Sequence, residues 1–214
     1  HLNCEQNELT SLSDTLPSSL LTLNCGIGNK LTSLSDTLPS SLHKLYCSYN
    51  KLTSLPNTLP NSLHKLDCNN NELTSLPNTL PNSLQELCCW RNKLTSLPNT
   101  LPSSLQYLEC DRNKLTSLPD TLPSSLQELV CSCNELYYLP DTLPSSLQKL
   151  VCNHNKLTSL PNSIIQCINL RSIVYYNNEI EYIPLHLTRF LNRVRNIDVG
   201  SVKIYPFKSD KDIK

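Results

Sequence analysis

LQELCCWRNKLTSLPNTLPSS, residues 84–104, is the stretch that decides the fold, because most of the chain repeats it. Its asparagine belongs to a series at Asn7, Asn29, Asn50, Asn71, Asn92, Asn113, Asn134, Asn155 and Asn178. The steps in this series are 22 residues, then 21 residues six times, then 23 residues. A cysteine precedes the asparagine by three residues, or by four at Cys25, in the series Cys4, Cys25, Cys47, Cys68, Cys89, Cys110, Cys131 and Cys152. A period of this length predicts a stack of similar structural units.

Each position of the unit has a physical role. Leu87 and Cys89 alternate with other residues, so this part reads as a short strand with its leucine and cysteine facing inward. Strands of neighbouring units then pair in parallel, about 4.8 Å apart, and stacking joins their apolar faces into one core. The asparagine follows where the chain turns inside the stack, and its amide offers a donor and an acceptor to buried backbone groups. We therefore expect a ladder of asparagine side chains.

The second half of the unit, L-T-S-L-P-x-T-L-P-x-S, predicts no regular helix. Its two prolines remove backbone donors and push the preceding residues toward extended or polyproline geometry. Such segments are slim, so both faces stack at similar spacing and the curvature is gentle. The pattern predicts an α/β-type leucine-rich repeat solenoid with a parallel β-sheet on the concave face. The convex face is extended or polyproline, and we expect little helix except near a C-terminal cap.

The chain divides into three parts. Residues 1–162 hold leucine-rich repeats of about 21 residues, and they begin in mid-unit, so we expect the N-terminal cap to be missing. The resulting open sheet edge favours end-to-end self-association. Residues 163–207 are degenerate repeats that we expect to form the C-terminal cap, and residues 208–214 are predicted to be disordered.

Two departures from the pattern predict local features. The loop after Cys25 is one residue longer than its counterparts, which predicts a bulge that carries Ile27. Further along, Tyr175 takes the position of the cysteine. Residues 163–168 and 185–193 have room for one or two helical turns.

The unit L-x-x-L-x-C-x-x-N-x-L-T-S-L-P-x-T-L-P-x-S resembles the short, proline-rich class of leucine-rich repeats found in bacterial type III secretion effectors. The resemblance covers residues 2–162. In those effectors the repeats are recognition surfaces, sometimes beside a ubiquitin-ligase domain with a catalytic Cys-x-Asp motif, which does not occur here. The repeats are also similar to those of amoebae and their giant viruses. The absence of alanine and the abundance of Asn, Lys, Ile and Tyr favour such a source.

The cysteines are predicted to be structural. Eight of the 11 occupy the inward position, where a free thiol behaves as a small apolar group. Side chains on neighbouring parallel strands do not converge, which disfavours disulfides, and one thiolate per strand does not make a zinc site. An unpaired ladder favours a reducing, intracellular compartment, the host cytoplasm if the source is a virus or an effector-producing bacterium. We interpret Cys88, Cys133 and Cys167 as surface variation in preference to reactive thiols.

The outward residues of the sheet are the candidate binding site, because solenoids generally bind on the concave face. Tryptophan, tyrosine and arginine are the residues most enriched in binding hot spots, and the single tryptophan falls on this strip. The alternative is that the aromatics pack on their neighbours and that the arginines pair with nearby carboxylates. The predicted partner-binding residues are Trp90, Arg91, Tyr107, Glu109, Asp111, Arg112, Tyr46, Tyr49, Val130 and His154.

Composition limits the function. The 18 basic and 18 acidic residues balance, so no electrostatic footprint for nucleic acid or an anionic membrane is present. No apolar run approaches the roughly 18 residues that a membrane span needs. His43 and His64 share one position of the unit, but no carboxylate or thiolate recurs beside them. We therefore expect no enzymatic activity, no catalytic residue, no metal and no cofactor.

The sequence predicts a protein-protein interaction module that binds a protein or peptide on its concave face. Two alternatives stay open. One is a substrate-recruiting arm of a larger ubiquitin-ligase-type or effector protein. The other is a structural or virion-surface repeat protein without a specific ligand.

Overall fold

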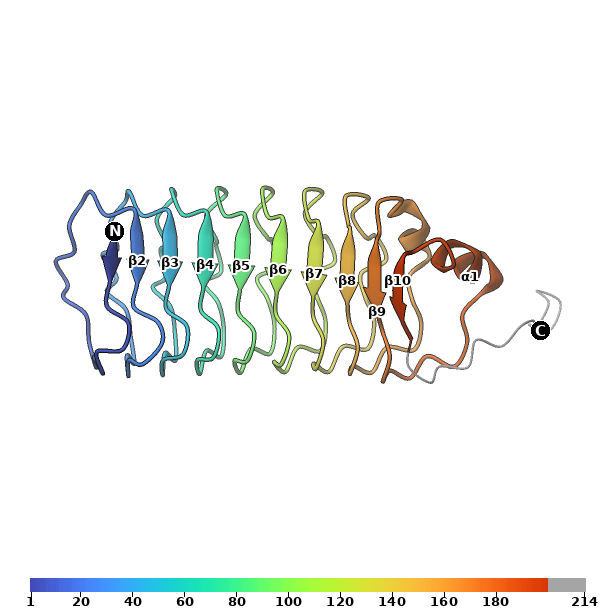
Figure 1. Cartoon of the computed structure of the whole chain (residues 1–214), viewed down its shortest axis with the longest axis horizontal. Helices are drawn as coiled ribbons and strands as arrows, with labels where there is room; N and C mark the ends of the chain where they lie inside the picture. Colours follow the sequence, from blue (N-terminus) through green and yellow to red (C-terminus); the bar gives the residue numbers. More distant parts are fainter. Residues whose placement is uncertain (200–214) are drawn as a thin grey trace.

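The computed structural model describes residues 1–199, which form a solenoid built on one parallel sheet. Its ten strands follow one another in chain order and lie side by side, all pointing the same way (Figure 1). The strands are β1 (Leu2–Asn3), β2 (Thr22–Asn24), β3 (Lys44–Tyr46), β4 (Lys65–Asp67), β5 (Glu86–Cys88), β6 (Tyr107–Glu109), β7 (Glu128–Val130), β8 (Lys149–Val151), β9 (Ser172–Val174) and β10 (Asn196–Asp198). The predicted parallel sheet is thus confirmed.

The register of the sheet follows from the leucine at the centre of each strand. Leu45 pairs with Leu66, and Leu66 pairs with Leu87, so each buried leucine stacks on the next. The strands are shorter than the alternating pattern predicts, because each ends before its ladder cysteine. Pairing nevertheless continues one residue further, since the N–H of Cys89 donates to the carbonyl oxygen of Glu109 at 2.8 Å.

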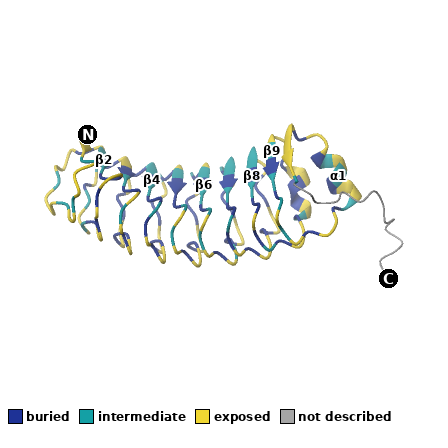
Figure 2. Ribbon diagram, turned by 60° about the horizontal axis from the view of Figure 1, so that its bottom comes forward, coloured by how far each residue is buried: buried dark blue, intermediate teal, exposed yellow. Residues whose placement is uncertain are grey.

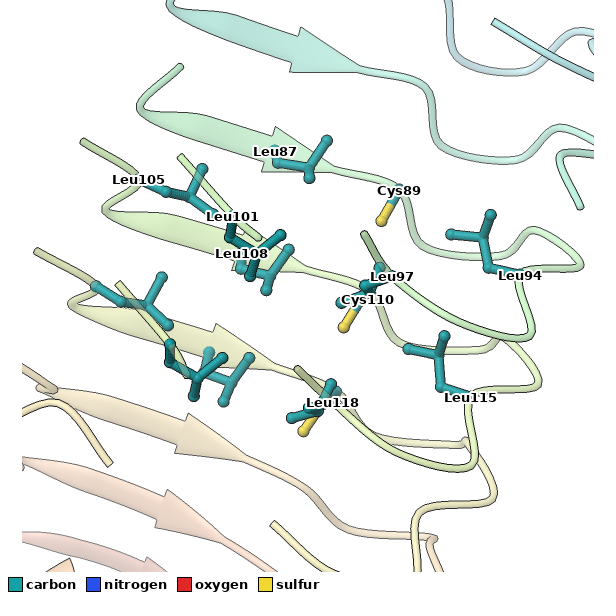
Figure 3. Close-up of a cluster of buried hydrophobic side chains, with 14 of the residues drawn as sticks. Leu87, Cys89, Leu94, Leu97, Leu101, Leu105, Leu108, Cys110, Leu115 and Leu118 are labelled. Atoms are coloured by element: carbon teal, nitrogen blue, oxygen red, sulfur yellow. The ribbon is translucent and has the colours of Figure 1, made fainter. Parts of the chain in front are cut away.

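The interior is a continuous stack of leucine and cysteine side chains. Leucines from the strand, from the turn and from the return segment all point into it, and the ladder cysteines lie among them (Figure 3). Burial of apolar surface of this kind contributes about 25 cal/mol per Å², which makes it the main stabilising term for a repeat that cannot fold alone. The labelled residues of Figure 3 are Leu87, Cys89, Leu94, Leu97, Leu101, Leu105, Leu108, Cys110, Leu115 and Leu118, all of them buried.

Two side-chain ladders satisfy the buried backbone of the turns. Asn71 donates from Nδ2 to the carbonyl oxygens of Cys47, Cys68 and Asn69 at 3.0–3.1 Å, and its Oδ1 accepts from the N–H of Leu52 at 2.9 Å. This arrangement recurs along the stack and confirms the predicted asparagine ladder. A second ladder was not predicted: the serine that ends a unit donates to carbonyl oxygens near the end of the preceding unit and the start of its own, as Ser83 donates to Asn61 and Leu63 at 2.7 Å.

The return segments are extended, and the molecule curves gently with the sheet on its inner, concave side (Figure 2). Within residues 1–199, helix occurs only near the C-terminal end, as the 3-10 helix η1 (Asn162–Gln166) and the α-helix α1 (Leu185–Leu191). Both occur where helical turns were predicted. No helix of the described part has the length and apolar character needed to cross a bilayer.

The irregular positions also agree with the sequence. Ile27 lies exposed on the bulged loop, which Gly28 closes with a φ of 81° while passing close to Gln6. Tyr175 is buried in place of the ladder cysteine. The remaining residues of the predicted cap, 200–207, and the predicted disordered tail, 208–214, lie outside the described residues.

The interpretation of two cysteines as surface variation is wrong. Cys88 faces the concave side but is only 7% exposed, because longer side chains on β4 and β6 cover its short one. Cys167 is fully buried, since the chain after η1 directs its thiol inward, where it donates to the carbonyl oxygen of Pro144 at 3.4 Å. Cys133 is half-buried.

Candidate functional site

The concave face consists of four rows of side chains, defined here for β3 to β9. The first row precedes the buried leucine: Lys44, Lys65, Glu86, Tyr107, Glu128, Lys149 and Ser172. The second row follows it: Tyr46, Asp67, Cys88, Glu109, Val130, Val151 and Val174. The third row follows the ladder position: Ser48, Asn69, Trp90, Asp111, Ser132, Asn153 and Tyr176. The turn row comes next: Tyr49, Asn70, Arg91, Arg112, Cys133, His154 and Asn177.

The turn row has a backbone that the sequence did not predict. All seven of its residues have a φ between 50° and 56°, the left-handed region that L-residues seldom occupy. Backbone hydrogen bonds hold this geometry: the N–H of Arg91 donates to Asp111 and the N–H of Arg112 donates to Ser132, both at 2.9 Å. The predicted site residues of this row therefore lie on turns and not on strands.

Tyr49 and Trp90 form an aromatic pair on this face. Their ring centroids are 6.4 Å apart at an interplanar angle of 86°, an edge-to-face contact. The two residues are two units apart, so the Trp90 ring reaches across the intervening unit toward Tyr49. Tyr49 stays 47% exposed and Trp90 is half-buried. Asn70, in the intervening unit, has a buried Nδ2 without a hydrogen-bond partner.

A hollow of about 410 Å³ lies beside this pair, lined by Tyr49, Asn50, Asn70, Asn71 and Arg91. The sequence grouped Tyr46 with Tyr49, but Tyr46 does not line this hollow. Its ring faces the ammonium group of Lys65, 5.8 Å from the ring centroid.

Carboxyl groups surround Cys88 at the centre of the face. Asp67 and Glu109 flank it on the neighbouring strands, and Asp111 follows Glu109 in the third row. Burial is the main cause that raises the pKa of each of these three carboxyl groups, and the charges of Asp111 and Asp67 raise that of Glu109 further. Burial, then the charge of Asp67, also raises the pKa of the Cys88 thiol to about 12. The centre of the face is therefore an electronegative, partly desolvated patch.

The first row supplies few cations to this patch. Lys65 is bound to Glu86 at 2.5 Å, and Lys149 to Glu128 at 3.4 Å. Tyr107 lies between the two glutamates, half-buried, and burial followed by the charge of Glu109 raises the pKa of its phenol. A second hollow opens here, lined by Lys65, Glu86, Cys88, Gln106, Tyr107, Gln127 and Glu128.

The two arginines of the predicted site, Arg91 and Arg112, differ in their ion pairing. Arg112 approaches Asp111 at 4.0 Å with a side chain that is 64% exposed, a geometry that contributes less than about 1 kcal/mol. Arg91 forms no ion pair with the described residues and borders the hollow beside Tyr49. The alternative of internal pairing thus applies weakly to Arg112 alone.

The second row is apolar in the C-terminal third of the face. Val130 pairs with Val151, and Val151 pairs with Val174, so three valines form a continuous stripe. Beyond it the ring of His154 packs against Tyr176, with centroids 5.3 Å apart. Sequence reasoning missed Val174 and Tyr176 because they follow residue 162, where the consensus ends. Ile173 takes the position of the buried strand leucine. Aligning it with Leu150 would have placed Val174 in the second row and Tyr176 in the third.

Two histidines lie at one end of these rows. His43 and His64 stack with centroids 5.1 Å apart and nearly parallel rings at the entrance of β3 and β4. Within residues 1–199, no three side chains of His, Cys, Asp or Glu are grouped so as to hold a metal ion. The face offers an aromatic pair, a carboxylate-rich centre and an apolar stripe.

Comparison with known proteins identifies similar chains. The family model described as Leucine Rich Repeat matches residues 41–61. A Shigella effector LRR domain is 33% identical with a TM-score of 0.64, and the match covers 80% of this chain and 78% of that chain. A search of curated proteins found no match.

Two other solved structures resemble nearly the whole chain. YopM from Yersinia enterocolitica WA-314 is 28% identical with a TM-score of 0.60, and the match covers 96% of this chain and 52% of YopM. The functional domain of InlJ from Listeria monocytogenes, which includes a cysteine ladder, is 27% identical with a TM-score of 0.74, over 97% of this chain and 50% of that one. The chain therefore spans about half the length of these two proteins.

Proposed function

Since the chain belongs to the leucine-rich repeat family, we propose that it is a protein-interaction module that binds a protein or peptide on its concave face. The fold is generally used for protein-protein interaction, and its concave surface is the usual site. The observation that carries the proposal is the pair of Tyr49 and Trp90, which remains accessible on that face instead of packing into the core. Tyrosine and tryptophan with a nearby arginine, here Arg91, are the typical composition of a binding hot spot.

The chemistry of the face supports a polypeptide partner. The face carries charges of both signs, and in its first row Lys65 pairs with Glu86 and Lys149 pairs with Glu128. It therefore lacks the basic surface that attracts nucleic acid or anionic lipid. The aromatic pair, the carboxylates and the valine stripe together match the varied side chains of a protein segment. The 11 free cysteines support a reducing, intracellular setting for this activity.

Substitution of the aromatic pair tests the proposal. Trp90→Ala and Tyr49→Ala should each weaken partner binding by about 2 kcal/mol or more, roughly 30-fold in Kd, because hot-spot aromatics carry most of the binding energy. Partners captured from lysate on the wild-type chain are identified by mass spectrometry. Their affinities for the purified variants are then measured by isothermal titration calorimetry.

Tyr138→Ala is the matched control, since Tyr138 is 56% exposed on the return segment, outside the four rows. It should leave the Kd unchanged. A partner that binds Trp90→Ala as tightly as the wild-type chain and loses affinity for Tyr138→Ala would contradict concave-face binding. Binding of no partner at all would favour a purely structural repeat protein.

The similarity to a Shigella effector LRR domain supports a second possibility, in which the same face recruits a substrate for a larger effector protein. The chain spans about half of YopM, so such an arm would act with sequence beyond the residues printed here. A full-length gene that encodes a catalytic domain beside these repeats would favour this role.

A further inference from the structure

One border of the concave face carries more cations than carboxylates. This cationic border consists of the turn row and of the residue two positions after each of its members, in the units of β3 to β6. Its charged residues are all exposed and comprise five cations and one carboxylate: Lys51, Arg91, Lys93, Arg112, Lys114 and Glu72. Glu72 is bound to Lys93 at 2.8 Å, and Asp111 of the third row approaches only Arg112, at 4.0 Å. The border therefore keeps a net positive charge.

The hollow beside Tyr49 opens at the cationic border. Of the residues that line it, Arg91 is the only charged one. Asn50 and Asn71 belong to the asparagine ladder, where their amides already bind the backbone. The walls that remain for a ligand are Tyr49, Asn70 and Arg91, and the volume of about 410 Å³ is large enough to admit a side chain. The hollow thus presents a cation and no anion.

The guanidinium group of Arg91 has no partner in the part of the chain that the structure describes. Its side chain forms no ion pair or hydrogen bond there, whereas Lys93, two residues further along, is bound to Glu72. The backbone of Arg91 is nevertheless held in place, with a φ of 53° and an N–H that donates to the carbonyl oxygen of Asp111 at 2.9 Å. The base of the side chain is therefore positioned at the hollow while the charged end is available to a ligand.

Charge complementarity selects an acidic side chain as the occupant of this hollow. A guanidinium group binds a carboxylate through two parallel, charge-assisted hydrogen bonds. A basic side chain would be repelled by Arg91 and Lys51, and an apolar one would bury the guanidinium group without a partner. A long polyanion such as a nucleic acid would also meet the second-row carboxylates of Asp67 and Glu109 on the same face. A single carboxylate on a polypeptide therefore fits best.

Resting on the function proposed above, we propose that the partner places an aspartate or glutamate side chain in the hollow between Tyr49 and Arg91, where the guanidinium group of Arg91 binds its carboxylate. Lys51 and Arg112 of the cationic border raise the local positive potential and attract the acidic segment. Tyr49 also contacts Trp90, so the acidic residue lies next to the residue that covers the aromatic pair. The partner is thus recognised by an acidic residue beside an apolar one.

Nuclear magnetic resonance shows which arginine of the folded chain a carboxylate binds. The probe is N-acetyl-glutamate N-methylamide, and the control is the glutamine analogue, which has nearly the same shape but no charge. The glutamate probe should shift the Nε–H signal of Arg91 saturably, with a Kd on the order of 10 mM, and the glutamine analogue should bind at least about fivefold more weakly. Equal affinities for the two compounds, or no saturable shift at Arg91, overturn the proposal.

Removal of the Arg91 charge tests the same contact by substitution. Arg91→Gln should weaken binding of the glutamate probe by about fivefold or more, measured on the backbone N–H signal of Tyr49, which the variant retains. Arg171→Gln is the matched control, because Arg171 is exposed just before β9 and outside the four rows, and it should stay within about twofold of the wild-type Kd. Circular dichroism confirms that both variants are folded. Wild-type affinity of Arg91→Gln, or an equal loss in Arg171→Gln, overturns the proposal.

The two proposals fail in different ways. A captured partner should lose about tenfold in Kd with Arg91→Gln, because a charge-assisted contact is removed. If the partner loses affinity for Trp90→Ala but binds Arg91→Gln as tightly as the wild-type chain, the proposed function stands and the acidic contact is wrong. If the glutamate probe binds at Arg91 while every captured partner ignores Trp90→Ala, the carboxylate site exists and the proposed function is wrong.

Discussion

The asparagine of each unit stabilises the fold through backbone groups that no other side chain reaches. Asn71 is typical, because one amide satisfies three buried carbonyl oxygens and one N–H from two consecutive units. An apolar replacement would leave these groups unpaired in a space too tight for bulk water. The ladder therefore explains why asparagine recurs at a position where size alone would admit leucine.

Asn71→Ala should lower the free energy of unfolding by about 1–3 kcal/mol, the cost of leaving buried polar groups without partners. Urea denaturation followed by circular dichroism measures it. Asn78→Ala makes the same change at an exposed position of the return segment and should stay within about 0.5 kcal/mol of the wild-type chain. Equal effects of the two variants would show that the ladder contributes nothing specific.

The strands determine where the ladder thiols point. From Cys25 to Cys152, each ladder cysteine follows a three-residue strand whose central leucine is buried, so successive thiols stack inside the sheet. Burial raises the pKa of Cys25 to about 12 and keeps other ladder thiols protonated as well. Protonated, buried thiols are inert, because the thiolate is the reactive form.

Alkylation with iodoacetamide at mildly alkaline pH should distinguish the two classes of cysteine. Cys4 and Cys133 are half-buried and should react first, whereas the other nine should react only after denaturation. Mass spectrometry of the labelled peptides gives the order. Rapid labelling of the buried ladder thiols, Cys25 to Cys152, in the native protein would contradict the inward register.

The same thiols give stability a pH dependence. Their folded-state pKa lies above the ordinary value of 9.0, so the folded state keeps protons that the unfolded chain releases. The unfolding free energy is therefore unaffected by them below pH 9 and falls as the pH rises from about 9 toward 12.

The whole molecule behaves as a one-dimensional stack, because each strand pairs only with its neighbours in sequence. Stability in such a molecule is close to a sum over units and over the interfaces between them. The strand order also fixes the concave face as a set of rows that run through every unit, so a binding site on it extends across several units.

Deletion of residues 126–146 tests this description, since it removes one whole unit and joins Ser125 to Leu147 in the same pattern. The shortened chain should keep its β-sheet spectrum by circular dichroism and melt cooperatively at a modestly lower temperature, because all other interfaces remain. Deletion of residues 126–136 cuts within a unit and should prevent folding. If the chain folded equally well after both deletions, its stability would not depend on each unit keeping its register with the next.

The sequence by itself determined most of the features that recur with the period, although not the serine ladder. These features are the parallel sheet, the inward leucines and cysteines, and the asparagine ladder, and the bulge at Ile27 is a local departure from the same pattern. Each depends on the contact between one unit and the next. That geometry repeats without change, so reading one unit suffices. The left-handed conformation of the turn row was not predicted, because the residue types in this row vary, as Tyr49, Arg91 and His154 show. Only backbone hydrogen bonds keep these residues in that conformation.

Tertiary structure alone decided which outward side chains meet. The contact of Tyr49 with Trp90 spans two units, Cys88 is covered by its longer neighbours, and Lys65 bonds to Glu86. Such contacts depend on side-chain length and conformation after the stack has formed, and these do not follow the period. The backbone pattern therefore lies in the sequence, whereas the detailed arrangement of side chains on the concave face is set only when the units are stacked.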